Sequence, residues 1–239
     1  MTAKWRQIIR LSVLLGLFSL GAAPASLWGE EGTPGGAETE AKKSLNQGKK
    51  HLAAGRLEEA IVELRNSLRL KPDSWEAHHQ LGGALVRKGQ LDGAKAEFQE
   101  TLRLNPNFLE AYYDLGYVYL SKGQLNEAIS EYRQALKISP TDPRTHTNLG
   151  GAYLATGRIE EAIRELQEAL RLRPDNAKAH YNLGLAYAAK EQLDVAIREI
   201  EEALRLSPGE EDYQDLLNDL KRERGGKNGH SPRGPRTGP

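Results

Sequence analysis

Three histidines are the residues in this sequence whose type and spacing come nearest to a metal site. His78, His146 and His180 fall at one phase of a 34-residue spacing. Imidazole nitrogens are common zinc ligands, but all of them must lie about 2 Å from one ion. Side chains at one phase of successive helical units lie about 10 Å apart, the usual packing distance of helices. We therefore predict no metal site and interpret these histidines as packing residues.

The sequence contains no arrangement typical of a catalytic centre. It has no cysteine, which excludes thiol catalysis, thiolate metal sites and disulfides, and it has no nucleophile elbow, phosphate loop or zinc helix motif. Its acidic pairs lie near Arg or Lys, as surface ion pairs on helices do. These pairs are Glu58-Glu59, Glu160-Glu161 and Glu201-Glu202. We predict that the protein is not an enzyme and uses no cofactor and no small-molecule substrate.

A period of 34 residues organises the chain. Charged residues make up 28% of it and aromatic residues only 6%, which is typical of arrays of amphipathic helices rather than of a thick core. Each period ends in a stretch such as RLKPD or RLRPD, where proline stops a helix. The prolines are Pro72, Pro106, Pro140, Pro174 and Pro208. Such self-similarity predicts a solenoid of repeated units.

Other positions recur with the same period. In the third unit they are Tyr112, Leu115, Gly116, Tyr119, Ala128, Tyr132, Ala135 and Pro140. In this pattern the sequence resembles the tetratricopeptide repeat family, and the first unit departs from it most. The resemblance implies an all-α, right-handed superhelix, an α-solenoid of five helix pairs with a capping helix. The units span residues 41–74, 75–108, 109–142, 143–176 and 177–210, and the cap spans residues 211–224.

Glycine has two roles in this pattern. At the Leu-Gly position it lets the two helices of a unit approach closely, and seven residues later it permits positive φ in the turn between them. The fifth unit has Glu191 at the turn position. We expect this substitution to cost about 1 kcal/mol.

The resemblance also implies where a partner binds. In this family the first helices line a concave groove that holds an extended peptide or a helix of another protein. The sixth position of each unit carries an amide or a carboxylate, and these side chains form a ladder able to bind a peptide backbone. The ladder is Asn46, Gln80, Asp114, Asn148 and Asn182. The alternative is that these residues only stabilise the repeat.

Aromatic and basic residues add to the predicted groove. Tyr113, Tyr117 and Tyr181 stand beside glycines, which leaves pockets against aromatic walls of the kind found at binding hot spots. Arg87 and Arg144 lie on the same side and are placed to meet a carboxylate. A solvated face is the alternative reading. The family's chaperone-binding clamp has Lys and Asn at the fifth and ninth positions of a unit, where the first unit has Leu45 and Lys49, and this argues against a chaperone adaptor.

The N-terminus has the order of a secretory signal peptide. Lys4, Arg6 and Arg10 precede the apolar run 11–20, and an Ala-Pro-Ala cleavage site ends at Ala25. We expect residues 1–25 to be removed and the protein to be periplasmic or extracellular. An uncleaved segment would instead anchor it in the inner membrane, facing the periplasm.

The formal net charge of zero hides an uneven distribution. Basic residues dominate both ends, so the repeat region is acidic, and we expect no binding of nucleic acid. Residues 26–40 are predicted to be a flexible acidic linker, and residues 225–239 a disordered basic tail. The favoured function is a protein-binding scaffold. The alternatives are a self-assembling structural protein and a membrane-anchored accessory factor of an envelope secretion, pilus or polysaccharide assembly system.

Overall fold

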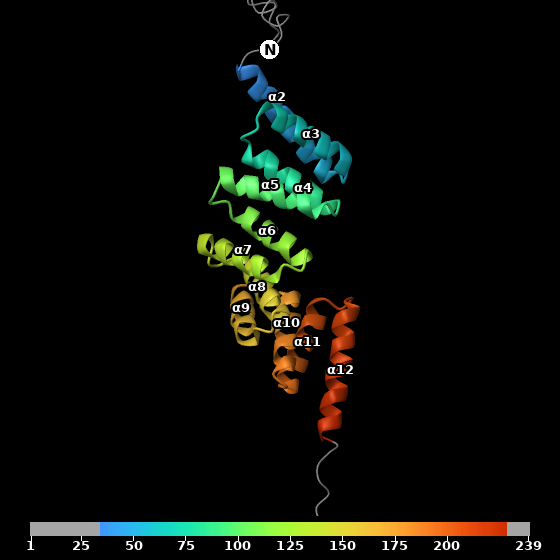
Figure 1. Ribbon diagram of the computed structural model, residues 1–239. Helices are drawn as coiled ribbons and strands as arrows, with labels where there is room; N and C mark the ends of the chain where they lie inside the picture. The colour runs from blue at the N-terminus through green and yellow to red at the C-terminus, as the bar shows by residue number, and fades with distance from the viewer. Residues whose placement is uncertain (1–33, 229–239) are drawn as a thin grey trace, which may run out of the picture.

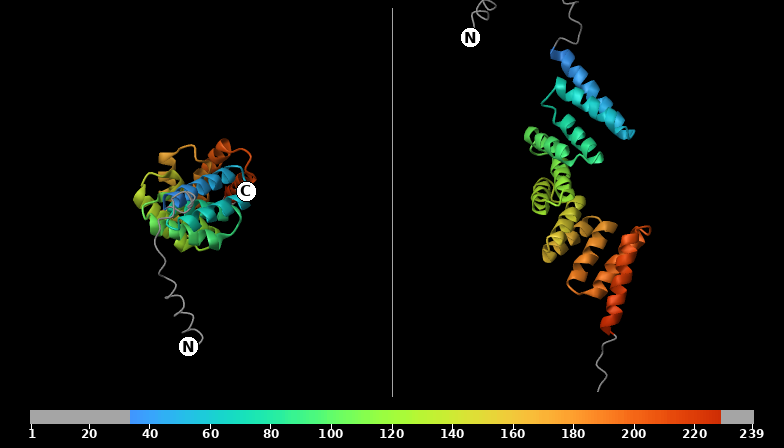
Figure 2. Two further views of the ribbon diagram at one scale, coloured as in Figure 1. Left: turned by 90° about the horizontal axis from the view of Figure 1, so that it is seen from above. Right: turned by 45° about the vertical axis from the view of Figure 1, so that its right-hand side comes forward.

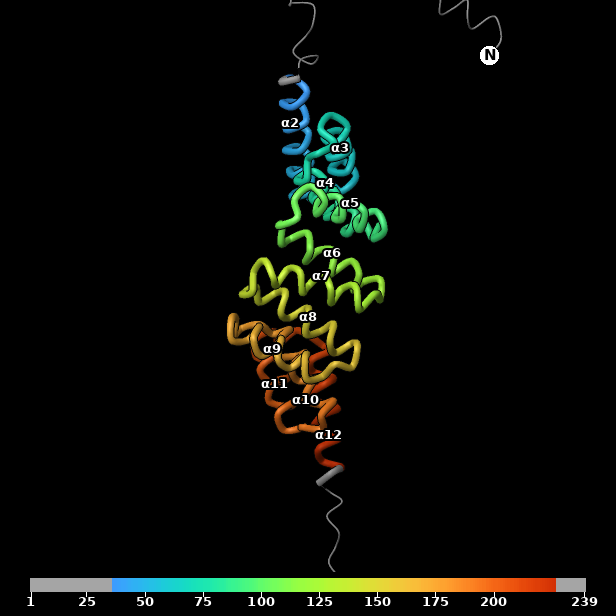
Figure 3. Tube along the Cα trace, turned by 60° about the vertical axis from the view of Figure 1, so that its left-hand side comes forward, coloured from blue at the N-terminus to red at the C-terminus, as the bar shows by residue number. Residues whose placement is uncertain are grey.

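The computed structural model describes residues 34–228, which form eleven α-helices and no strand (Figure 1). The helices are α2 (Pro34–Ala53), α3 (Leu57–Leu70), α4 (Trp75–Arg87), α5 (Leu91–Leu104), α6 (Leu109–Ser121), α7 (Leu125–Ile138), α8 (Pro143–Ala155), α9 (Ile159–Leu172), α10 (Ala177–Ala189), α11 (Leu193–Leu206) and α12 (Glu211–Asn228). They stack in chain order along one axis and turn about it (Figures 2 and 3). The predicted solenoid of five helix pairs and a cap is confirmed.

Each helix pair is built by the sequence signals that repeat every 34 residues. Ser74, Asp142 and Asn176 cap first helices by accepting a hydrogen bond from a backbone N–H of the first turn. The turns between paired helices contain residues with positive φ, namely Gly55, Gly89, Gly123 and Gly157 at 71 to 74° and Glu191 at 58°. The left-handed turns, including the one without glycine, agree with the prediction.

Close contact between paired helices depends on the glycine of the Leu-Gly position. A Cβ placed on Gly82 would lie 2.5 Å from the Phe98 ring, and one on Gly150 would lie 2.6 Å from Leu166 Cγ. Both partner side chains are fully buried. Glycine is therefore needed at this position because the second helix occupies the space of a side chain.

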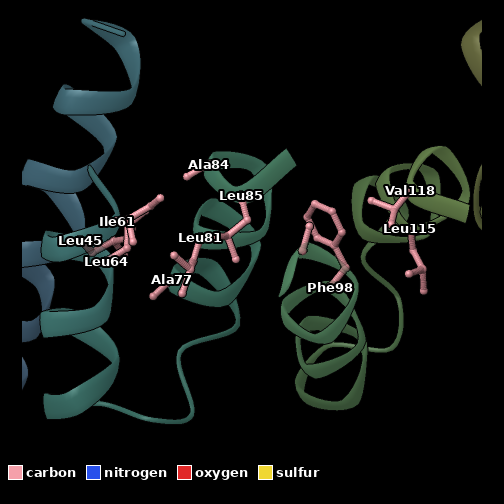
Figure 4. Close-up of a cluster of buried hydrophobic side chains, with 11 residues drawn as sticks. Leu45, Ile61, Leu64, Ala77, Leu81, Ala84, Leu85, Phe98, Leu115 and Val118 are labelled. Carbon is pink, nitrogen blue, oxygen red and sulfur yellow. The ribbon is translucent and has the colours of Figure 1, made fainter. Parts of the chain in front are cut away.

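The core runs along the array between the helices instead of filling a centre. In the N-terminal half it joins α2 and α3 to α4, α5 and α6 through residues such as Leu64, Leu81 and Phe98 (Figure 4). Similar clusters follow around Leu149 and Leu166 and, at the end, between α11 and α12. Every unit thus buries its apolar stripe against its neighbours.

Two predicted boundaries were wrong. Residues 34–40, expected in the flexible linker, form the first turns of α2, where Glu38 pairs with Lys71 of α3 at 2.7 Å. At the other end, α12 continues to Asn228 instead of ending at 224. Arg224 pairs with Asp194 at 3.3 Å, which holds this part of the helix against α11.

Residues 1–33 and 229–239 are not described, so the predicted signal peptide, the rest of the linker and most of the basic tail lie outside the described residues. Among the helices of residues 34–228, none combines the length and apolar character needed to cross a bilayer.

Candidate protein-binding face

One face of the array is formed by the first helices of the units. Successive first helices contact each other, α2 with α4, α4 with α6 and α8 with α10. The predicted ladder residues all lie on these helices. We call the surface that they and their neighbours on α2, α4, α6, α8 and α10 form the first-helix face.

Three of the predicted residues meet between α6 and α8. Asn148 Nδ2 donates to the Tyr113 hydroxyl at 2.9 Å, and the Arg144 guanidinium lies over the Tyr113 ring, 5.1 Å from its centroid. Arg144 also pairs with Asp142 at 3.2 Å. Aromatic, amide and cationic groups are therefore held together in fixed positions on this face.

Lys178 of α10, which the sequence analysis missed, extends this group. Its Nζ donates to Asn148 Oδ1 at 3.0 Å, and the described residues offer it no carboxylate partner. Partial burial lowers the pKa of Lys178, whose side chain still reaches solvent, and raises that of Tyr113, since desolvation disfavours the charged form of each. Lys178 stands at the same phase as Arg144, and reading that phase along the sequence would have found it.

The ladder residues share a phase but not an environment. Asn148 and Asn182 are buried, with 6% and 9% of their surface exposed, whereas Asn46 is exposed and Gln80 is half-buried. Asp114 Oδ2 lies 2.9 Å from His79 Nε2 of the neighbouring first helix, so its carboxylate already has a partner. The five side chains therefore form a row of separate sites rather than one continuous ladder.

Asn182 is the ladder residue whose side-chain amide has the fewest contacts with other polar groups. Within residues 34–228 its side chain has no hydrogen-bond partner, although it is nearly buried. A Cβ on Gly151 of α8 would lie 3.3 Å from Asn182 Nδ2. The missing side chain at residue 151 therefore leaves the amide the space that it occupies.

The remaining predicted residues are divided between exposed and structural positions. Tyr117 is 46% exposed and is open to a partner. Tyr181 stacks on Tyr213 of the cap, with ring centroids 4.4 Å apart. Arg87 Nη1 donates to the Leu52 carbonyl at 2.8 Å and so closes the end of α2.

A hollow of about 360 Å³ opens on the first-helix face at the N-terminal end. Asn46, Lys42 and Leu45 of α2 line it together with Glu76 of α4. Lys49, also in the lining, pairs with Glu76 at 3.5 Å. This hollow has both charges and an apolar wall, so it suits a mixed peptide side chain.

The three histidines at one phase of the repeat form hydrogen bonds to a glutamate and to a backbone carbonyl. His146 Nδ1 lies 2.7 Å from Glu165 Oε2, and its Nε2 lies 2.9 Å from the Pro140 carbonyl oxygen. His78 and His180 have the same two kinds of partner. Because a carboxylate and a carbonyl both accept, each ring serves both partners when its two nitrogens carry hydrogen. The histidines therefore fasten the loop after each proline to a second helix.

The pKa of His146 reflects this arrangement. Burial on its own would lower the pKa, but the hydrogen bonds to Glu165 and Pro140 outweigh burial and raise it above its usual value. The third unit has Tyr112 at this position, and there burial raises the pKa of Glu131. Within residues 34–228, His, Asp and Glu form no group of three able to hold a metal ion.

The acidic pairs that the sequence analysis assigned to the surface make ion pairs there. Glu58 pairs with Lys88 at 3.1 Å and Glu160 with Lys190 at 3.4 Å. Glu201 pairs with Lys221 of the cap at 2.8 Å. These carboxylates form surface ion pairs that connect neighbouring units, and they do not face each other across a cleft.

The geometry defines a helical solenoid of 34-residue units whose first helices present tyrosines, amides and cations. The chain belongs to the tetratricopeptide repeat family. A family model described as "TPR repeat" matches residues 116–157 and 150–191, and two models described as "Tetratricopeptide repeat" match residues 51–116, 85–132 and 177–210. Proteins of this kind are scaffolds that bind other proteins.

Solved structures agree with this assignment. MamA from Desulfovibrio magneticus RS-1 is 29% identical, with a TM-score of 0.67 over 72% of this chain and 97% of that one. YrrB, described as a TPR protein with an unusual peptide-binding site, is 23% identical, with a TM-score of 0.64 over 75% of this chain and 90% of that one. The YrrB likeness shows the fold alone. No curated protein matches this chain in sequence.

Proposed function

We propose that this protein is a non-enzymatic scaffold that holds an extended segment of a partner protein along its first-helix face, outside the cytoplasm. The observation that carries the proposal is the group formed by Tyr113, Asn148 and Lys178, which are fixed by hydrogen bonds of 2.9 and 3.0 Å. A peptide needs donors and acceptors for its backbone and an apolar wall for its side chains. This group supplies all of them.

The fixed geometry favours binding. Side chains that are already hydrogen-bonded to one another lose little freedom when a partner arrives, so less of the interaction energy is spent on ordering them. The exposed ring of Tyr117 adds apolar area one turn along α6. YrrB, a protein of the same fold, has a peptide-binding site, and this is consistent with such a role here.

Export is part of the proposal and rests on the N-terminal sequence. Lys4, Arg6 and Arg10, the apolar run 11–20 and the small residues ending at Ala25 are the features of a signal peptide. If this segment stays attached, the same features favour a membrane-anchored accessory factor of an envelope assembly system. Cell fractionation with mass spectrometry of the N-terminus separates the two: a chain starting at Ser26 supports a free exported protein, and one starting at Met1 supports the anchored form.

Affinity capture with a matched pair of variants tests the binding face. Tyr117→Ala with Lys178→Ala removes two solvent-reaching side chains of the first-helix face. Val62→Ala removes a side chain that is 57% exposed on the second helix α3. We expect the tagged parent and the Val62 variant to retain the same envelope partner and the double variant to lose it while keeping its helical circular dichroism. Equal capture by all three proteins would refute the assignment of the first-helix face.

A further inference from the structure

Two neighbouring pockets open on the side of the second helices, where the third unit meets the fourth. They have volumes of about 470 and 390 Å³ and share Arg133, Lys137 and Arg158. Leu149 and Tyr153 of α8 lie in the wall of the larger pocket, between α7 and α9. We call the two pockets together the junction cleft. Its charged residues lie on α7 and α9 and just before α9, and none of the residues predicted for the groove lines it, so it is separate from the first-helix face.

The junction cleft holds cationic groups without matching carboxylates. Arg133 makes no ion pair with any residue of the described chain, and neither does Arg164 of the larger pocket. Lys137 Nζ donates to the neutral amide of Gln134 at 3.1 Å. Of the two acids in the lining, Glu161 pairs with Arg158 at 2.8 Å, and Glu165 is held by its histidine. The cleft therefore has an excess of positive charge in an otherwise acidic repeat region.

In three of the other four units the cation at the phase of Lys137 is compensated by a carboxylate. Units two, four and five carry a Glu three residues before an Arg on the second helix, and these residues pair with each other. The pairs are Glu100–Arg103, Glu168–Arg171 and Glu202–Arg205, at 2.6, 2.6 and 2.5 Å. The third unit has Gln134 and Lys137 at these two positions, and the first unit has Asn66 and Arg69. One carboxylate is thus lost at the cleft, and the charge of Lys137 is left uncompensated.

A second departure from the repeat removes a side-chain bridge at the cleft. In units two and four a glutamine bridges to the tyrosine of the next unit: Gln99 to the Tyr119 hydroxyl at 3.4 Å, and Gln167 to the Tyr187 hydroxyl at 3.2 Å. The third unit has Arg133 at this position. No such bridge joins it to Tyr153, whose ring is covered instead by the Arg158 guanidinium at 4.4 Å.

The fourth unit contributes as much to the cleft as the third. The first unit also has an arginine, Arg65, at the phase of Arg133, but the unit after it supplies Gln90 and Ala96 where the fourth unit supplies Arg158 and Arg164. Several independent substitutions therefore shift the charge in one direction at one junction. A surface that only meets water would not require several substitutions that all add positive charge at the same junction.

We propose that the junction cleft binds an acidic segment of a partner protein, with carboxylates on Arg133, Lys137 and Arg164 and an apolar side chain against Leu136, a half-buried residue of α7 in the lining of the larger pocket. Arginine is suited to this because its planar fork can hold a carboxylate with two hydrogen bonds. The cations are spread over two adjoining pockets, and Leu136 lies in the lining of the larger one, which fits an extended segment with alternating carboxylates and apolar groups better than a single small anion. The segment is distinct from the one proposed for the first-helix face.

The test uses the full chain and a fluorescent peptide of alternating Glu and Leu, with fluorescence polarisation as the readout. The variant combines Arg133→Gln, Gln134→Glu and Lys137→Arg, which gives the third unit the residues that units two and four already have, so the fold is retained. We expect its affinity for the peptide to fall by about tenfold or more. Arg65→Gln, the same exchange at the first unit, is the control and leaves the affinity unchanged.

Three further measurements can overturn the proposal. A peptide of alternating Gln and Leu that binds as tightly would show that the carboxylates are not recognised. Pyrophosphate or phosphatidylserine vesicles that bind more tightly than the peptide, with the binding lost in the triple variant, would show a phosphate site instead. Loss of peptide binding in the Tyr117→Ala, Lys178→Ala variant with normal binding by the triple variant would place the acidic segment on the first-helix face.

Discussion

Two adjacent glycines of α4 should respond in opposite ways to the same substitution. A Cβ on Gly82 would lie 2.5, 2.8 and 3.0 Å from three ring carbons of Phe98, whereas a Cβ on Gly83 would meet nothing within 4 Å. Phe98 has no exposed surface and is packed on all sides, so its ring cannot move away freely. We therefore expect Gly82→Ala to destabilise the array and Gly83→Ala to stabilise it.

The magnitude follows from two opposing effects. Replacing glycine by alanine inside a helix contributes about 0.5–1 kcal/mol of stability by restricting the unfolded chain. An extra carbon in a tightly packed core costs about 1–3 kcal/mol. Because the helix contribution is the same at both positions, the free energies of unfolding of the two variants should differ by about 1–3 kcal/mol, with Gly82→Ala the weaker.

Urea unfolding followed by circular dichroism at 222 nm, with the parent alongside, measures this difference. Repeat arrays can unfold in parts, so the transition midpoint and slope should both be compared. Equal midpoints for Gly82→Ala and Gly83→Ala would refute the reasoning, because they would mean that α4 and α5 can separate at no cost to admit the methyl group.

Two further predictions concern single residues. The raised pKa of His146 means that its contribution to stability is fully present below the pKa of an unfolded histidine and is lost as pH rises through the folded pKa. Between pH 5 and pH 8 the thermal unfolding midpoint of His146→Gln should therefore fall less than that of the parent. Equal falls in the two proteins would contradict this. Glu191 has a φ of 58° at a turn where the other units have glycine, so Glu191→Gly should raise the thermal unfolding midpoint and increase the free energy of unfolding by up to about 1 kcal/mol. A lower midpoint would show that the side chain of Glu191 stabilises the turn by more than its backbone conformation costs.

The helix pairs of this protein could be predicted from the sequence because the signals that specify each pair act locally. A proline every 34 residues, a glycine at the close approach and a glycine at the turn specify a helix pair without reference to the rest of the chain, and Glu191 was identified from the same register. The start of α2 at Pro34 could not be read in this way. Glycine and acidic residues there favour a linker, but the contact of Glu38 with Lys71 lies outside any local pattern.

The contacts on the first-helix face were harder to predict than the helix pairs. The phase of each residue placed Tyr113 and Asn148 on the correct helices, but their contact depends on the rotation between successive units, which no single repeat encodes. The histidines show a second limit. They were interpreted as packing residues, whereas His146 also bonds to Glu165, 19 residues away on the partner helix. A comparison of all units at both phases would have shown that histidine and glutamate recur together.

The contacts between helices run mainly from each helix to the next one in sequence. Contacting residues are therefore close in chain position, and domains with this property fold in microseconds to milliseconds because little loop-closure entropy must be lost before contacts form. A chain that is threaded unfolded through a narrow channel would thus regain its order unit by unit, as each emerging helix pair packs against the pairs that preceded it. The array would not need its far end to be present before the near end becomes ordered.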